Sequence, residues 1–332
     1  MSRFDIREHP IGTTRGHATQ GPRDVQGFTL EAGDGFAATV WSYGATLVDF
    51  SYPDRGGRMH NLVQRLPDLS SYEDRSRNPY LGATMGRYAR VIANGRFELN
   101  GQKFDVTRNI GAHHFHGGSI GFDRLVWQPR PEQTADSVGV RFELVSPEGD
   151  QGYPGELRAT TWYRLFADGR LSLEYQATTT RSTVVAMTNH ANWNLAGHST
   201  IDNHSLRIRA SRVLLVDSDL IPTQPQNVAL AQLDFRQLRR IGPTRLDHTF
   251  IVDEPLAALE LYESHSGRLL ELSTDHSGLQ VYSGEVLPQR RSGLCIQTGA
   301  WPNSPNRADF PSSRLDPGAT YRHQTTLRFS IR

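Results

Sequence analysis

The sequence predicts an all-β fold in which antiparallel strands form one large β-sandwich. Short segments of alternating apolar and polar residues recur along the chain and are separated by turn dipeptides, while helical patterns are scarce. Strands spaced by turns, without intervening helices, favour antiparallel sheets in a sandwich or barrel. No internal repeat, linker or shift in composition divides the 332 residues, so we expect a single domain over 1–332.

The first hairpin signal is the Asn100-Gly101 pair. Apolar residues alternate before the pair, from Phe97, and after it, from Phe104. Asn-Gly between two alternating runs favours a two-residue turn, because both central residues of a type I′ turn need a positive φ. We therefore expect two strands joined by a tight turn within 96–106.

Later segments repeat this pattern. Alternating residues in 162–166 and 171–175 flank the Asp-Gly pair at 168–169, and a third hairpin is expected at the Ser-Gly pair 266–267. Leu, Phe and Ile alternate in 327–331 and predict a last strand with one buried face.

One segment carries a helical pattern instead. Apolar residues recur at roughly helical spacing in 228–241 and predict a helix there; they are Leu230, Leu233, Leu238 and Ile241. Short turns are expected near 66–74.

Charge and cysteine content exclude several classes of protein. Lys plus Arg is 36 and Asp plus Glu is 35, so neither a nucleic-acid partner nor a membrane surface is expected. The one cysteine, Cys295, cannot form a disulfide within the chain, which favours a reducing compartment. Residues 1–21 are polar and lack the apolar core of a signal peptide. We therefore expect a cytoplasmic protein.

The densest polar cluster is 113–118, which reads His-His-Phe-His-Gly-Gly. On a strand, His114 and His116 would face the same side, as two ligands of a metal ion do. That interpretation needs a nearby carboxylate, and the first one downstream is Asp123, beyond a glycine-rich turn. No metal is therefore predicted at this cluster.

The adjoining residues 117–121 match the Gly-x-Ser-x-Gly pattern of a hydrolase nucleophile, with Ser119 at its centre. The pattern has catalytic meaning only where a strand turns into a helix. The following segment, 122–128, is short and runs into Pro129 and Pro131. No helix fits there, so we interpret the match as coincidence.

Several later segments carry groups that suit a sugar. Residues 188–195 combine amides, an imidazole and an indole, which offer paired donors and acceptors and a ring face for stacking. Asp247 adds a carboxylate, a strand over 279–285 ends in Glu285, and 297–306 is rich in amides and proline. Each segment fits a polar strand end or a surface loop equally well.

An ordered set of motifs spans essentially the whole chain. The motifs are Gly86-Arg87-Tyr88-Ala89, Ile92-Ala93-Asn94-Gly95-Arg96-Phe97, His116-Gly117-Gly118, Gly121-Phe122-Asp123, Gly152-Tyr153-Pro154-Gly155, Thr188-Asn189-His190, Asn194-Leu195-Ala196-Gly197, Asp247-His248, Gln280-Val281-Tyr282-Ser283-Gly284, Trp301-Pro302 and Leu315-x-Pro317-Gly318. Each is modest alone, but in this order they resemble the aldose 1-epimerase (galactose mutarotase) family. The resemblance implies the family's large antiparallel supersandwich. It also implies interconversion of the α and β anomers of free aldoses, without a cofactor or a metal.

The resemblance also implies roles for individual residues. By position, His190 is the proton donor and His116 the assisting histidine, while Asp247 and Gln280 bind sugar hydroxyls. Histidine suits a proton donor because its usual pKa of about 6.5 lies near neutral pH. Further substrate-binding residues are expected at the positions of Arg87, Arg90, Asn192 and Trp193.

The position of the family's glutamate base is occupied by Gln297, and a neutral amide cannot act as a general base. Further departures stand at Arg90-Val91, where the family often has Asn-Arg, at Asn192-Trp193, and at Gly299 and Asn303. Glu285 is the first candidate to replace the base, and Asp247 is the second. Several coordinated changes indicate natural divergence of the pocket.

Three functions therefore stay open. The expected one is an isomerase that interconverts anomers of an aldose or sugar derivative by acid and base ring opening. The alternatives are a non-catalytic sugar-binding protein and a different reaction on an acidic sugar, a keto sugar or a lactone, in which Arg90 pairs with an anionic group. The expected partner is a monosaccharide, and the chain is expected to be a monomer or homodimer.

Overall fold

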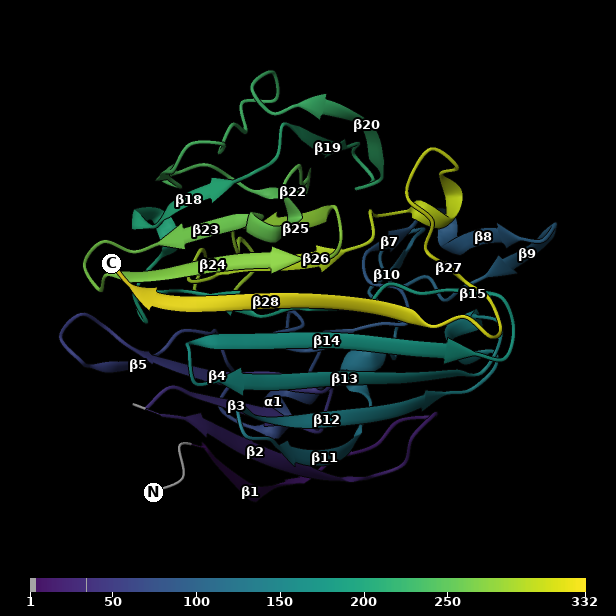
Figure 1. Ribbon diagram of the computed structural model, residues 1–332. Helices are drawn as coiled ribbons and strands as arrows, with labels where there is room; N and C mark the ends of the chain where they lie inside the picture. Colours follow the sequence, from purple (N-terminus) through teal and green to yellow (C-terminus); the bar gives the residue numbers. More distant parts are fainter. Residues whose placement is uncertain (1–3, 34) are drawn as a thin grey trace.

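The computed structural model describes residues 4–33 and 35–332 and consists almost wholly of antiparallel strands (Figure 1). A nine-stranded sheet carries the longest strands. In spatial order it contains β11 (Gln128–Gln133), β12 (Ser137–Ser146), β13 (Leu157–Phe166), β14 (Arg170–Thr179), β28 (Tyr321–Ile331), β24 (Arg268–Thr274), β23 (Leu259–Tyr262), β18 (Ser205–Ile208) and β21 (Arg239–Arg240). The all-β, antiparallel prediction is confirmed.

Two further sheets pack against the nine-stranded one. The first contains, in order, β1 (Phe4–Thr13), β2 (Asp24–Ala32), β3 (Ala37–Trp41), β4 (Thr46–Pro53) and β5 (Met59–Asn61). The second contains β17 (Asn192–Trp193), β26 (Leu294–Gly299), β25 (Gly278–Tyr282), β22 (Asp247–Ile251), β19 (Arg212–Val216) and β20 (Pro222–Asn227). In Figure 1 the five-stranded sheet lies beside β11 to β14, and β19, β22 and β25 lie beside β18 and β23.

Short pairs and turns complete the structure. Four two-stranded pairs are β7 (Val91–Ile92) with β10 (His114–Phe115), β6 (Thr84–Met85) with β16 (Thr188–Asn189), β8 (Arg96–Leu99) with β9 (Gln102–Asp105), and β15 (Thr183–Val184) with β27 (Arg314–Leu315). The one α-helix among the described residues, α1 (Leu69–Glu73), starts at Asp68, whose side chain accepts from the backbone N–H of Ser71. Single 3₁₀ turns occur at Ala93–Gly95, Phe122–Arg124, Asp150–Gly152, Ile201–Asn203, Pro255–Ala257 and Ser304–Asn306.

The predicted hairpins are present. Asn100 and Gly101 have φ values of 53° and 74° and join β8 to β9 by a type I′ turn. Gly169, at φ 84°, closes the loop between β13 and β14. The Ser-Gly pair at 266–267 lies in the turn from β23 to β24, and β28 is the predicted last strand.

The predicted helix over 228–241 is wrong. The segment forms turns that lead into β21, and the predicted pattern does not form one buried face, because Leu230 is 82% exposed and Leu238 36% exposed. The buried residues are Val228, Leu233, Phe235 and Ile241. Backbone pairing of β21 with β18 and the positive φ of Gln232 (58°) outweigh the local spacing.

A cluster of aromatic rings joins the three sheets. Phe50 of β4 lies 4.3 Å from Phe329 of β28 and 5.2 Å from Trp193 of β17, measured between ring centroids. All three rings are at most 1% exposed, and burying large aromatic side chains provides much of the hydrophobic stabilisation of a core. Among the described residues, no helix is long and apolar enough to span a membrane.

Candidate functional site

A cavity of about 260 Å³ opens at one end of β22, β25 and β26 and brings together eight of the ten predicted site residues. These eight are Arg90, His116, His190, Asn192, Asp247, Gln280, Glu285 and Gln297. A larger open depression of about 820 Å³ is lined by β2, β11 and β12 residues and contains no histidine. The smaller cavity, with its converging polar groups, is therefore the candidate site.

A tight loop places His116 in the cavity. His116 has φ 50°, and the next residue, Gly117, has φ 87°. A Cβ atom at Gly117 would lie 1.8 Å from the carbonyl oxygen of Gly86, so only glycine fits there. The backbone N–H of His116 donates to the carbonyl of Arg90, and the N–H of Arg90 donates to Nδ1 of His116, both at 3.1 Å. The ring proton of neutral His116 therefore resides on Nε2.

The same geometry separates His116 from His114. The strand β10 ends at Phe115, and the positive φ of His116 breaks the alternation on which the metal interpretation depended. His114 is buried elsewhere, with Nδ1 donating to the carbonyl of Thr107 and Nε2 accepting from the hydroxyl of Tyr153, both at 2.6 Å. The two histidines therefore do not form a metal site.

The serine of the hydrolase-like pattern lies outside any such site. Ser119 is exposed, and the segment after it forms only the 3₁₀ turn Phe122–Arg124. The interpretation of the match as coincidence agrees with this geometry.

His190 and His116 lie next to each other in the lining of the cavity. Their ring centroids are 5.3 Å apart, and the ring of Tyr80 lies 4.8 Å from His116 and 5.7 Å from His190. Burial lowers the pKa of His190 to about 4 and that of His116 well below its usual value, and the Arg90 charge adds to both shifts. Both rings are therefore neutral near pH 7 when the cavity is empty.

Cys295 lies behind His190, with its sulfur 3.5 Å from Nδ1. Burial raises the pKa of this thiol, which makes it an inert neighbour rather than a nucleophile. Asn192 donates from Nδ2 to the carbonyl of His190 at 3.0 Å, and its buried Oδ1 has no partner among the described residues. That oxygen is an unsatisfied acceptor beside His190.

Strands β22 and β25 supply a chain of hydrogen bonds. Thr249 donates to Oε1 of Gln280 at 2.6 Å, and Nε2 of Gln280 donates to Oδ1 of Asp247 at 2.7 Å. Thr249 and Gln280 are directly paired across the two strands. Burial raises the pKa of Asp247, while Arg90 and Arg245 oppose the shift. This carboxyl is consequently a stronger proton acceptor than an exposed aspartate.

Glu285 follows the turn after β25 and is held by protein groups. Its Oε1 accepts from the Ser283 hydroxyl at 2.7 Å and from Arg291 at 2.9 Å. Its Oε2 is buried and has no partner among the described residues. The carboxylate is thus held by an ion pair with Arg291, which also pairs with Asp202.

Gln297 lies on β26 opposite Gln280 of β25. Its Nε2 is buried without a partner among the described residues, and its backbone carbonyl accepts from Nη2 of Arg90 at 3.2 Å. An unpaired buried N–H is costly, and a bound hydroxyl that reached this amide would remove that cost.

The structure places Arg87 and Trp193 away from the cavity and so corrects their prediction as sugar contacts. Trp193 belongs to the aromatic core described above. Arg87 is 2% exposed and donates to the carbonyls of Ser146, Pro147, Pro154 and Gly155 and to the Ser146 hydroxyl, at 2.6–3.1 Å. Both terminal nitrogens are occupied by these acceptors, while the buried Nε has no partner among the described residues. The role of this side chain is therefore to fix the chain at 146–155.

Arg87→Met is expected to lower the free energy of unfolding by about 3 kcal/mol, because it leaves several buried carbonyls unpaired. Urea denaturation measures the change, with Arg322→Met at an exposed position of β28 as the matched control, which is expected to stay within about 0.5 kcal/mol of the parent. Equal stability of the two variants would contradict this role for Arg87.

Several residues that line the cavity were not predicted from the sequence. Tyr80, Arg245 and Thr249 line the cavity together with the apolar side chains of Val216 and Leu220. Thr249 stands two residues after Asp247, so the period of a strand places both side chains on one face. Tyr80 and Arg245 lie in loops and carry no local signal.

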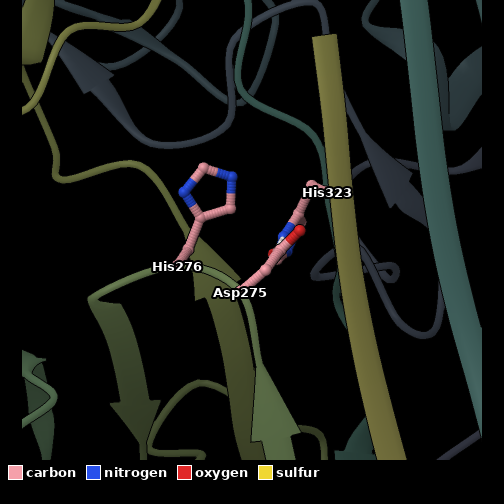
Figure 2. Close-up of side chains that lie close together, drawn as sticks. All are labelled: Asp275, His276 and His323. Carbon is pink, nitrogen blue, oxygen red and sulfur yellow. Dashed lines mark hydrogen bonds and ion pairs between the residues drawn. The ribbon is translucent and has the colours of Figure 1, made fainter. Parts of the chain in front are cut away.

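A second cluster of titratable groups lies outside the cavity, between the loop after β24 and β28 (Figure 2). The possible ligand atoms of Asp275, His276 and His323 lie within 4.8 Å of one another. Nδ1 of His323 is 2.5 Å from Asp275 Oδ1, and Nε2 is 2.9 Å from the Thr298 hydroxyl. Because hydrogen bonds occupy both nitrogens of His323, the cluster is better described as a polar link between β24, β28 and β26.

Comparison with known proteins gives consistent matches. The family model described as aldose 1-epimerase matches residues 26–328. The chain is 34% identical to galactose mutarotase of Bos taurus, over 94% of this chain and 96% of the relative, and 33% identical to aldose 1-epimerase of Escherichia coli (strain K12), over 91% and 94%. The crystal structure of a galactose 1-epimerase from Lactobacillus acidophilus NCFM superposes with a TM-score of 0.85 at 25% identity, covering 98% of this chain and 99% of that one.

Proposed function

The chain belongs to the aldose 1-epimerase family, and from this premise we propose that it binds a monosaccharide in the cavity and interconverts its α and β anomers. The observation that carries the proposal is the convergence of two neutral histidines, His116 and His190, with the Asp247–Gln280 pair in one cavity. Its volume of about 260 Å³ is below that of pockets for drug-sized ligands, which suits a single sugar ring.

Ring opening requires a proton acceptor for the anomeric hydroxyl and a proton donor for the ring oxygen. Gln297 cannot accept a proton, so one of the cavity's carboxylates has to serve. Asp247 is the better candidate, because its Oδ1 is oriented by Gln280 while no described residue donates to its Oδ2. Its raised pKa also brings its basicity closer to working pH.

Glu285 is less suited to this role. Its Oε1 is already engaged by Arg291 and by the Ser283 hydroxyl, which hold the carboxylate in place. The order of the two candidates is therefore reversed relative to the sequence analysis, with Asp247 first.

His190 is the proposed proton donor, and His116 orients the sugar beside it. Donation requires the charged imidazolium, which a pKa of about 4 makes scarce near pH 7. Turnover is therefore expected to be slow unless the bound substrate itself favours the charged ring. The amide of Gln297 would donate to a sugar hydroxyl.

Asp247→Asn is expected to slow anomer exchange about 10²-fold, because a positioned proton acceptor contributes about that factor. Exchange NMR on freshly dissolved glucose, galactose, glucuronate and galacturonate measures the rate. Asp219→Asn, an exposed position outside the cavity, is the matched control, and Glu285→Gln is expected to reduce the rate far less than Asp247→Asn.

If Asp247→Asn retains the full rate, Asp247 is not the base. If the parent protein binds these sugars without accelerating exchange, the alternative of a non-catalytic sugar-binding protein replaces the proposal.

A further inference from the structure

Arg90 and Arg87 are buried arginines three residues apart with opposite surroundings. Arg87 donates from its two terminal nitrogens to five acceptors, and its Nε alone has no partner among the described residues. Arg90 is 6% exposed and lines the cavity, yet its guanidinium makes a single hydrogen bond to the described residues, from Nη2 to the carbonyl of Gln297. Since a guanidinium carries five N–H donors, most of those of Arg90 are left for a ligand.

The backbone holds Arg90 in this position at a conformational cost. Its φ is 78°, a value that residues with a side chain rarely adopt. Two hydrogen bonds between Arg90 and His116, one donated by each backbone N–H, hold Arg90 in this positive-φ conformation. Strained residues of this kind persist where the surrounding structure fixes them, often at ligand sites.

The charges that line the cavity do not balance. No described carboxylate forms an ion pair with Arg90 or with the exposed Arg245, whereas Glu285 is paired with Arg291. Asp247 is the one cavity carboxylate without an arginine partner among the described residues, and it is bonded to Gln280. Two unpaired cations thus face one unpaired anion. A buried charge without a partner is costly, and an anionic ligand would remove that cost.

We propose that the sugar bound here carries an anionic oxygen group, a carboxylate or a phosphate, which the free N–H donors of Arg90 bind and which Arg245 attracts. The planar guanidinium fork matches the geometry of such oxyanions. This inference rests on the proposed function only in using the same cavity.

An anionic substrate also bears on the proton donor. The positive charge of Arg90 is one cause of the low pKa of His190 and of His116. A bound anion offsets that charge and so favours the imidazolium that ring opening requires. Charged sugars would then be turned over faster than neutral ones.

Calorimetric titration of the full chain at low salt tests the proposal. The probes are glucuronate and galacturonate, their neutral counterparts glucose, galactose and glucuronamide, and glucose 6-phosphate, which separates a phosphate from a carboxylate preference. We expect at least one anionic sugar to bind about tenfold or more tightly than its neutral counterpart, since a charge-assisted hydrogen bond contributes about that factor.

Variants identify the residues responsible. Arg90→Gln is expected to abolish the preference for the anionic sugar, Arg90→Lys to retain part of it, and the exposed Arg245→Gln to weaken it with the fold intact. Arg130→Gln on exposed β11 is the control and keeps the full preference. Thermal unfolding verifies that each variant is folded, and Arg245→Gln decides the test if Arg90→Gln does not fold.

Equal or tighter binding of every neutral sugar overturns the proposal, as does an unchanged preference in both Arg90→Gln and Arg245→Gln. Anomer exchange measured on the same samples separates this inference from the proposed function. Tight binding of an anionic sugar without exchange supports the anion site and contradicts the catalytic proposal. Exchange of neutral sugars without any preference for anions contradicts the anion site alone.

Discussion

Acidification from pH 6.5 to pH 5 is expected to lower the free energy of unfolding by on the order of 5 kcal/mol. Burial lowers the pKa of His114, His190 and His204 to about 4, against a usual value of 6.5. All three rings are buried, at most 8% exposed. The loss is comparable with the whole stability of many domains.

The sign follows from proton binding. Between pH 6.5 and pH 4 the unfolded chain binds protons at these histidines and the folded chain does not, so unfolding is favoured as the pH falls. The stabilisation is fully present above pH 6.5. It decreases through the window down to about pH 4, by roughly 1.4 kcal/mol per pH unit for each histidine. His116, whose pKa is lowered further, adds in the same direction.

Urea denaturation at several pH values between 5 and 7.5 measures this slope. His204 does not line the cavity, and its Nε2 accepts from the backbone N–H of Leu195 at 2.9 Å. His204→Gln can retain an acceptor but no longer titrates, so it is expected to remove the share of one histidine, roughly 1.4 kcal/mol per pH unit. A free energy of unfolding that is flat between pH 7.5 and pH 5 would show that these rings become charged inside the folded protein.

Local signals predicted the hairpins, because each depends on a few neighbouring residues. The φ values of Asn100, Gly101 and Gly169 are dictated by turn chemistry that can be read from the sequence. The prediction of a helix over 228–241 was wrong for the opposite reason. The leucine spacing of this segment is local, but its structure is decided by pairing of Arg239 and Arg240 with β18, far away in sequence.

In the cavity, too, some features follow from local sequence and others depend on residues distant in the chain. The motifs and the departures from them predicted eight of its lining residues, and strand alternation from Asp247 would also have found Thr249. The difference between Arg87 and Arg90 was not predictable, because it depends on which distant carbonyls surround each guanidinium. Glu285 is no longer the first candidate for the base because a turn brings Arg291 to its carboxylate, which the sequence does not reveal. Side-chain roles in one motif are therefore decided by tertiary partners.

Gln297→Glu is expected to accelerate anomer exchange by about 10²- to 10⁴-fold over the parent protein, the range that a positioned acid or base contributes. Gln297 lines the cavity with His116 and His190, and the backbone carbonyl of Gln297 accepts a hydrogen bond from Arg90. A carboxylate there supplies a proton acceptor. It also offsets the Arg90 charge that lowers the pKa of His190, so the proton donor becomes easier to charge.

A double-mutant cycle decides whether the new carboxylate takes over from Asp247. Asp247→Asn is expected to slow the parent about 10²-fold but to slow Gln297→Glu much less, because two acceptors then serve one step. Gln297→Met, which has similar volume and no charge, is the control and is expected to give no gain. Exchange NMR and thermal unfolding are measured on all variants. A folded Gln297→Glu protein that is no faster than the parent would mean that the missing carboxylate at position 297 does not limit the reaction.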